Sequence, residues 1–196
     1  MREHGVPEWY IDSCKKIKYM FPKAHAAAYV MMAYRVAYFK VHYPTEFYIA
    51  YYTVRADLFD AKIMAKGKEH LKNEMRRLEM KGQNEWSATE KSLYTIMEIC
   101  YEMYERGIEF LPVDLYKSHA FNFQKVGDKQ ILLPFNSFQG MGDAAAKNIM
   151  DAREDGPFLS KEELKVRAKL NKNVMETLEE SGCLKGLEES NQISFI

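Results

Sequence analysis

Two glycines that flank one apolar residue are the clearest candidate for chemistry in this chain. They are Gly140 and Gly142, separated by Met141, in the segment FQGMGDAAAKNI at residues 138–149. A backbone without Cβ atoms at these points lets a ligand come close. A helix is predicted to start directly afterwards with Asp143 as its N-cap, so that unpaired amides and the positive end of the helix dipole face outward. The pattern therefore predicts an anion site.

The residues after the glycines extend this pattern. Ala146 is predicted to keep the helix close to its neighbour and Ile149 to anchor it in the core, while Lys147 and Arg153 are candidates for phosphate contacts. The spacing G-h-G-x-x-x-A-x-x-I resembles the helix-hairpin-helix motif of DNA-binding proteins that do not select sequence, in which the bound anion is a phosphate of a duplex. The alternative is a plain turn between two helices, which explains one glycine but not the whole spacing.

A possible second copy of the motif is the segment LEESGCLKGL at residues 178–187. It lacks the two glycines around one apolar residue. We therefore predict that this segment is a structural partner helix and not a second phosphate contact.

A second candidate site is the segment FPKAHAAAY at residues 21–29. Pro22 suits the first turn of a helix, where nearby amides are unpaired, and Lys23 adds a positive charge that attracts phosphate. His25 and Tyr29 are four residues apart, so they share one helix face and could flank a base or a sugar. The alternative for a single histidine beside an apolar face is a role in the core or in a helix cap.

Composition and charge limit the class of protein. The 196 residues carry 28 basic and 28 acidic side chains, yet residues 1–81 hold 15 basic against 9 acidic ones, and the remainder hold 13 against 19. This asymmetry predicts that one part of the chain faces a polyanion. The three scattered cysteines have no metal-ligand spacing, and the longest apolar stretch ends at Arg35, which favours a cytoplasmic protein without disulfides, metal site or membrane span.

The periodicity predicts a mainly α fold. Helices are expected over residues 8–20, 22–43, 61–81 and 87–106, the last with a capping box at Ser87 and Glu90. Residues 45–52 could form a helix or a buried strand, and Pro44 with Glu46 favours the helix. A β-hairpin with a tight turn at Gly127 and Asp128 is expected over residues 121–133, and helices return from Asp143 to about Leu187.

Four segments, which stand in the family's order, resemble the C-terminal part of the alpha subunits of bacterial DNA polymerase III of the PolC type. The segments are YMFPKAHAAAYVMMAYRVAYFKVHYPTEFYIAYYTVRADLFD (19–60), LLPFNSFQGMGDAAAKNIMDARE (132–154), LNKNVMETLEESGCLKGL (170–187) and NQISFI (191–196). The resemblance implies that residues 1–115 are the distal part of a fingers domain and that residues 116–190 are a duplex-binding domain, with its helix-hairpin-helix motif at 138–154. Residues 191–196 would be a clamp-binding tail.

The resemblance also implies roles for particular residues. The family places a Phe-x-Lys-x-His-x-Ala-x-Tyr segment beside the incoming nucleotide, which points here to Phe21, Lys23, His25 and Tyr29. In the tail, Gln192 would hydrogen-bond at the edge of a pocket on the sliding clamp, and the residues after it would fill that pocket: Ile193, Ser194, Phe195 and Ile196. The usual Leu-Phe ending is Phe-Ile in this chain, so the pocket would receive a different shape.

Polymerase chemistry needs carboxylates that hold two metal ions, and no Asp-x-Asp pair of the family's palm type occurs in this sequence. The resemblance therefore implies that the parent enzyme, a DNA-directed DNA polymerase, holds its Mg²⁺ elsewhere, and that this chain alone is inactive and needs no cofactor. The expected partners are duplex DNA, the incoming deoxynucleotide in the full-length enzyme and a sliding clamp. The alternative is a free-standing accessory protein that binds DNA through the same motif.

Overall fold

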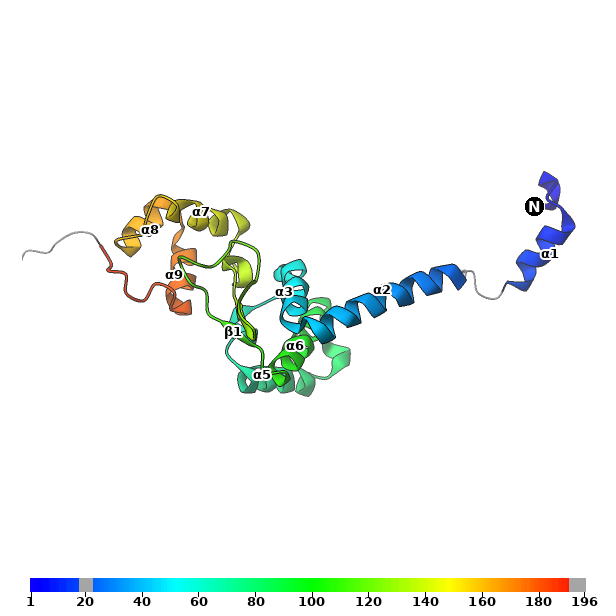
Figure 1. The fold of residues 1–196 in the computed structure, drawn as a ribbon, viewed down its shortest axis with the longest axis horizontal. Coiled ribbons are helices and arrows are strands. Elements are labelled where there is room, and N and C mark those ends of the chain that lie inside the picture. Colours follow the sequence, from blue (N-terminus) through cyan, green and yellow to red (C-terminus); the bar gives the residue numbers. More distant parts are fainter. Residues whose placement is uncertain (18–22, 191–196) are drawn as a thin grey trace, which may run out of the picture. The chain divides into compact units, whose positions relative to one another are not determined.

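The computed structural model describes residues 1–17 and 23–190, apart from the side chain of residue 83 (Figure 1). The chain divides into two compact units, Met1–His42 and Tyr43–Ile196. The predicted subdomain boundary near residue 115 is a statement about the parent protein and stays a prediction.

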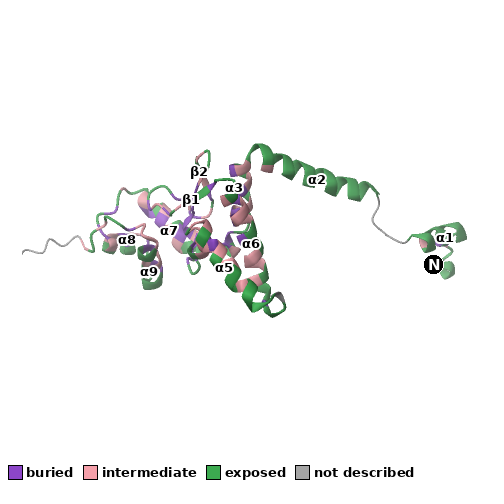
Figure 2. Cartoon of the chain, turned by 90° about the horizontal axis from the view of Figure 1, so that it is seen from below, coloured by how far each residue is buried: buried purple, intermediate pink, exposed green. Residues whose placement is uncertain are grey.

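The first unit consists of one 3₁₀ turn and two helices: η1 (Arg2–His4), α1 (Glu8–Lys16) and α2 (Lys23–His42). The long helix predicted over 22–43 is confirmed from Lys23 onward. None of the residues of α2 is buried, and its apolar side chains include Tyr34, which is 77% exposed. Figure 2 shows the same helix almost entirely in the colour of exposed residues.

The second unit begins with a group of helices: α3 (Pro44–Val54), η2 (Ala56–Leu58), α4 (Ala61–Met64), α5 (Lys68–Lys81), η3 (Gln83–Glu85) and α6 (Ala88–Glu105). The single helix predicted over 61–81 is wrong, because Gly67 has φ +96° and ends the helical conformation between α4 and α5. The predicted capping box of α6 is confirmed, with Ser87 and Glu90 exchanging hydrogen bonds of 3.1 and 2.8 Å.

A small sheet follows, with the strand order β1-β3-β2. The predicted hairpin is confirmed as β2 (Gln124–Gly127) antiparallel to β3 (Gln130–Leu132), whereas β1 (Glu109–Leu111), which is parallel to β3, was not predicted. The hairpin is tied to α3 by Thr45 Oγ1, which donates to the carbonyl of Asp128 at 2.5 Å, and by an ion pair of 2.7 Å between Lys125 and Glu46.

The chain continues through η4 (Phe135–Ser137) into three helices: α7 (Asp143–Arg153), α8 (Lys161–Arg167) and α9 (Lys172–Ser181). One hydrophobic core extends from Tyr48 to Leu184, so the helices α3–α6, the sheet and the last three helices share it. At its centre the rings of Tyr52, Phe59 and Phe123 have centroids 5.0 to 5.6 Å apart. The predicted class, mainly α with one hairpin, is confirmed.

Within the described residues, no helix is long and apolar enough to cross a membrane.

Candidate nucleic-acid interface

The turn before α7 has the geometry of a tight hairpin that leads straight into a helix. Gly140 has φ +89°, and the amide of Met141 donates to the carbonyl of Phe138 at 3.1 Å. Met141 is buried, so the turn is held to the core by its middle residue. Gly142 then takes the N-cap position of α7, with φ −69° and ψ 150°.

The absence of a side chain has a different physical reason at each of the two glycines. Only Gly140 has a left-handed backbone that disfavours other residues, since the φ and ψ of Gly142 suit any amino acid. Among the described residues, and apart from its chain neighbours, a Cβ atom added at either position meets no atom within 4 Å. Internal packing therefore does not explain the absence of a side chain at Gly142, and the space beside it is open to a ligand.

The prediction that Asp143 is the N-cap is wrong. Gly142 is the N-cap because its backbone is still extended, and Asp143 is the first helical residue, with an exposed side chain. No side chain caps this helix, and its first backbone bond runs from the amide of Ala146 to the carbonyl of Gly142 at 3.1 Å. The three amides of residues 143–145 precede that bond, and such amides lack partners inside a helix. They form a cluster of donors beside the open space at Gly142.

The two residues predicted to pack α7 are where the sequence placed them. Ala146 and Ile149 are both fully buried. The turn itself is also fixed to the preceding helices, because the side-chain amide of Gln139 donates to the carbonyl of Phe59 at 3.2 Å. The amides of residues 143–145 are thus held in place by these buried side chains and by this hydrogen bond. Such preorganisation favours binding because little conformational entropy has to be lost.

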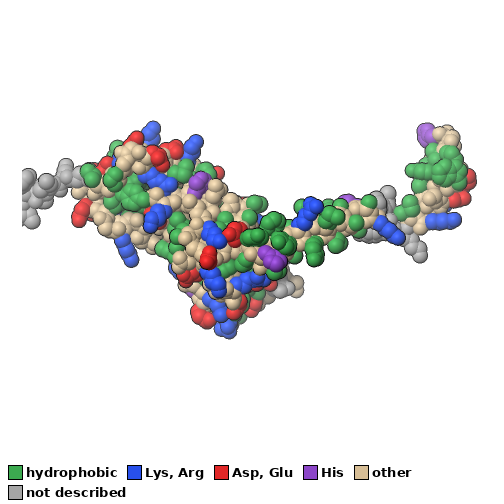
Figure 3. All heavy atoms as spheres, in the orientation of Figure 1, with side chains coloured by type: hydrophobic (Ala, Val, Ile, Leu, Met, Phe, Trp, Pro, Cys, Tyr) green, Lys and Arg blue, Asp and Glu red, His purple; other side chains and the backbone are tan. Residues whose placement is uncertain are grey.

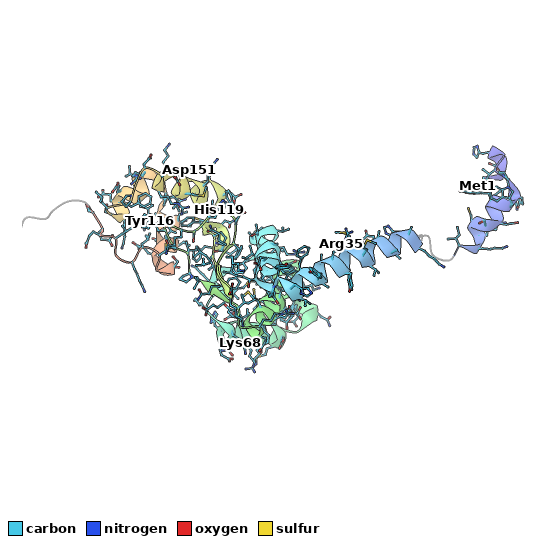
Figure 4. All side chains as sticks on the ribbon, in the orientation of Figure 1. Met1, Arg35, Lys68, Tyr116, His119 and Asp151 are labelled. Atoms are coloured by element: carbon cyan, nitrogen blue, oxygen red, sulfur yellow. The ribbon has the colours of Figure 1, made fainter. Side chains whose placement is uncertain are left out.

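The two basic side chains predicted beside the motif differ in their surroundings. Lys147 is exposed on α7. Arg153 is half-buried, and its Nη1 donates to the carbonyl of Ser118 at 2.7 Å and, more weakly, to that of Leu115 at 3.4 Å. Both carbonyls belong to the loop between β1 and β2, on which Figure 4 labels Tyr116 and His119. One nitrogen of the Arg153 guanidinium is therefore engaged inside the protein.

A second turn of similar form joins α8 to α9 and was missed in the sequence. Lys169 has φ +52°, Leu170 is buried, and Asn171 is the N-cap of α9 with φ −81° and ψ 170°. Each of these residues lies 29 positions after its counterpart in the first turn, Gly140, Met141 and Gly142. The signal was weak because a lysine and an asparagine replace the two glycines, and only the buried residue between them is shared.

The two turns differ in how their helices are capped. The side chain of Asn171 accepts from the amide of Val174 at 2.9 Å, so α9 satisfies one of its own free donors. Lys169 and Lys172 are exposed on either side of this cap, and Lys172 Nζ lies 3.5 Å from Glu176 Oε1 in an exposed ion pair that a phosphate would have to replace. The second turn therefore offers positive side chains with fewer free amides. The segment 178–187, predicted as a structural partner, forms the end of α9 and the turn after Gly182.

Charges over this region are mixed. Figure 3 shows basic side chains projecting from the part of the molecule that holds α7–α9, with acidic ones between them. The face seen in this view is therefore not uniformly positive.

The residues predicted near the nucleotide lie at the start of α2. Lys23, His25 and Tyr29 are all exposed, and the rings of His25 and Tyr29 are 4.5 Å apart, centroid to centroid, which confirms that they share one face. Phe21 lies outside the described residues, and so do all five residues of the predicted tail contact: Gln192, Ile193, Ser194, Phe195 and Ile196. In the described part of the chain, no group of three or more His, Cys, Asp or Glu side chains is placed to hold a metal ion.

Comparison with known proteins finds similarity over the whole length of the chain. The family described as "Helix-hairpin-helix motif" matches residues 107–193, a range that includes both turns. The whole chain is 57% identical over 195 residues to a protein named DNA polymerase III PolC-type from Clostridium perfringens. Proteins of the same name from Oceanobacillus iheyensis and Bacillus subtilis are 55% and 53% identical over 195 residues. This chain is homologous to part of PolC-type DNA polymerase III.

The chain spans only about 13% of the length of these PolC-type relatives. The similarity nevertheless covers 100% of the chain and is not limited to the helix-hairpin-helix region. A free-standing accessory protein that shares only the motif with PolC is therefore not favoured.

Proposed function

We propose that this chain holds duplex DNA within a replicative DNA-directed DNA polymerase. The observation that carries the proposal is the uncapped start of α7 beside Gly142, where a side chain would have met no protein atom. Amides and a helix dipole bind a phosphate without reading a base. Such a contact suits a polymerase of the PolC type, which has to move along any sequence.

Electrostatics divide the contact between two kinds of group. The amides of residues 143–145 would hold one phosphate, and Lys147 would neutralise a neighbouring one. Asp143 opposes this, because its carboxylate stands in the first turn of the same helix. The expected binding is weak and sensitive to salt.

The start of α2 would serve the incoming deoxynucleotide in the full-length enzyme. Lys23 is proposed to contact its phosphates and His25 and Tyr29, on one helix face, to flank its base or sugar, with Phe21 beside them. The exposed apolar side chains of α2 support a place inside a larger enzyme, because a surface of this kind usually contacts another protein part.

The remaining assignments rest on the family. Residues 1–115 are proposed as the distal fingers, 116–190 as the duplex-binding domain and 191–196 as a tail that binds the sliding clamp through Gln192 and the residues after it. The Mg²⁺ ions and their carboxylates would belong to another part of the polymerase, so the chain alone would not polymerise. The parent enzyme would act in the cytoplasm.

Duplex binding is tested with the double variant Gly140→Asp and Gly142→Asp, measured by fluorescence anisotropy on two duplexes of unrelated sequence at several salt concentrations. We expect equal affinity for both duplexes in the wild type and loss of binding in the variant. Gly82→Asp is the matched control, because Gly82 also has a left-handed backbone, φ +81°, with open space around it. Binding that survives in the double variant as it does in the control would refute the proposal.

Clamp binding is tested by capture of the chain on immobilised, purified sliding clamp, with and without residues 192–196. We expect that the truncated chain is no longer captured and that its affinity for duplex DNA is unchanged. Equal capture of both forms would refute the assignment of the tail.

A further inference from the structure

The side chain of Arg167, the last residue of α8, joins three segments of the helix-hairpin-helix region. Its Nη2 donates to the carbonyl of Ala152 near the end of α7 and, at 3.1 Å, to that of Gly156. Its Nη1 donates to the carbonyl of Pro157 at 3.3 Å and to Glu163 Oε1 at 3.0 Å.

The guanidinium is also enclosed. It lies 4.5 Å from the ring centroid of Phe158, and its side chain is only 21% exposed. Phe158 is itself buried, and its amide donates to the hydroxyl of Tyr116 at 3.1 Å. A planar group with several fixed donors suits such a position, whereas a lysine has all its donors on one nitrogen and could not reproduce the forked arrangement.

Together with the buried side chains of Ala168 and Leu170, these contacts hold the second turn in place. Arg167 directly precedes residues 168–171, and its carbonyl partners belong to the end of α7 and the connection after it. The other end of α7 is Gly142. The helix between them has eleven residues and acts as a rigid spacer of about 16 Å. The hydrogen bonds from Arg167 to the carbonyls of Ala152, Gly156 and Pro157 and to Glu163 are called the Arg167 clasp below. The clasp ties the second turn, through the end of α8, to the helix that begins at the first turn.

We infer that Arg167 is a positioning residue for DNA binding: it contacts no DNA itself and holds Lys169 and Lys172 in register with the phosphate contact at Gly142. The inference rests on the proposed duplex binding. An arginine in a DNA-binding region would ordinarily be taken as a phosphate contact, but the donors of this one are directed at carbonyls and at Glu163.

The test compares Arg167→Met with Lys165→Met in the full chain. Both remove one positive charge from α8, but Lys165 is exposed and its side chain takes no part in the clasp. Amide hydrogen exchange on the free protein is the first measurement. We expect exchange at residues 168–171 to rise at least about tenfold in Arg167→Met and to stay unchanged in Lys165→Met, since only the first removes hydrogen bonds that tie the end of α8 to α7 and the connection after it.

The salt dependence of duplex binding is the second measurement. The slope of log K against log salt is negative, and each lost phosphate contact reduces its magnitude by about 0.9. Arg167→Met is expected to reduce the magnitude of this slope by about 2, and the double variant Lys169→Met with Lys172→Met is expected to reduce it by the same amount. Combining all three changes should give no larger reduction than the lysine pair alone. Lys165→Met should reduce the magnitude of the slope by about 1 at most.

A slope change in Arg167→Met that equals that of Lys165→Met, or that adds fully to that of the lysine pair, would overturn the inference. If circular dichroism shows that Arg167→Met does not fold, Arg167→Lys takes its place in the same comparison, with a smaller change expected in the same direction. Failure of the wild type to bind any duplex would overturn the proposed function instead, and unchanged exchange at residues 168–171 would then overturn the positioning role separately.

Discussion

Replacing Gly142 by serine should separate the stability of this protein from its DNA binding. Gly142 is the N-cap of α7 and has a backbone conformation that serine adopts without strain. Serine is a slightly better N-cap than glycine, by a few tenths of a kcal/mol, because its hydroxyl accepts from an amide of the first turn. The variant should therefore unfold at the same or a slightly higher temperature than the wild type.

The same hydroxyl should weaken duplex binding. In α9 the side chain of Asn171 already occupies the amide of Val174, three residues on, and a serine at 142 would occupy the equivalent amide of Ala145. A phosphate would then lose one charge-assisted hydrogen bond, which contributes about 1.5–3 kcal/mol. Since about 1.4 kcal/mol corresponds to a factor of ten, the affinity should fall by about 10- to 100-fold.

The assay is duplex binding by anisotropy at fixed salt, together with thermal unfolding of the same samples. Asn171→Gly is the reciprocal control, because it removes a cap of the same kind and should lower stability by a few tenths of a kcal/mol without weakening duplex binding. A Gly142→Ser variant that is folded and binds the duplex as tightly as the wild type would show that the open space at this glycine does not receive a phosphate.

Two further predictions concern charges. Asp143→Asn should raise duplex affinity at low salt and have little effect at high salt, because it removes an exposed carboxylate from the first turn of α7. The measurement is a salt titration of binding, and a lower affinity in the variant would contradict the prediction. The hydrogen bond from Lys81, with those from the backbone and side chain of Ser87, lowers the pKa of Glu90 from 4.5 to about 2. A depressed pKa in the folded state stabilises the protein above pH 4.5, and this contribution is lost as the pH falls toward 2. The difference in unfolding free energy between wild type and Glu90→Gln, measured by urea titration, should therefore shrink as the pH falls over that interval. The same difference should be smaller in a Lys81→Met background, and a difference that does not depend on pH would contradict the assignment.

Features that depend on neighbours within one helical turn were predictable from the sequence. The capping box at Ser87 and Glu90 formed as expected, because its hydrogen bonds join residues three apart. The burial of Ala146 and Ile149 followed from their spacing after Gly142. The error at Asp143 was also local, a displacement of the helix start by one residue, because a glycine can take the N-cap position without offering a side chain to recognise.

Features that join distant residues were decided only by the tertiary structure. β1 pairs with β3 across about twenty residues, and three strand residues in sequence carry no pattern that specifies such a partner. The donors of Arg153 and Arg167 are directed at carbonyls 10 to 38 residues away, so neither side chain could be assigned to the protein interior from its sequence context.

The sequence by itself determined that the chain holds a tight glycine turn followed by a helix, since local backbone preference specifies that geometry. Only the folded chain revealed the matching turn at Lys169, where packing holds a lysine in a left-handed conformation that its own propensity disfavours. The tertiary structure also decided which basic residues remain available to a phosphate. An arginine and an exposed lysine look alike as charges in a sequence, whereas the carbonyls that a side chain meets depend on how the helices pack.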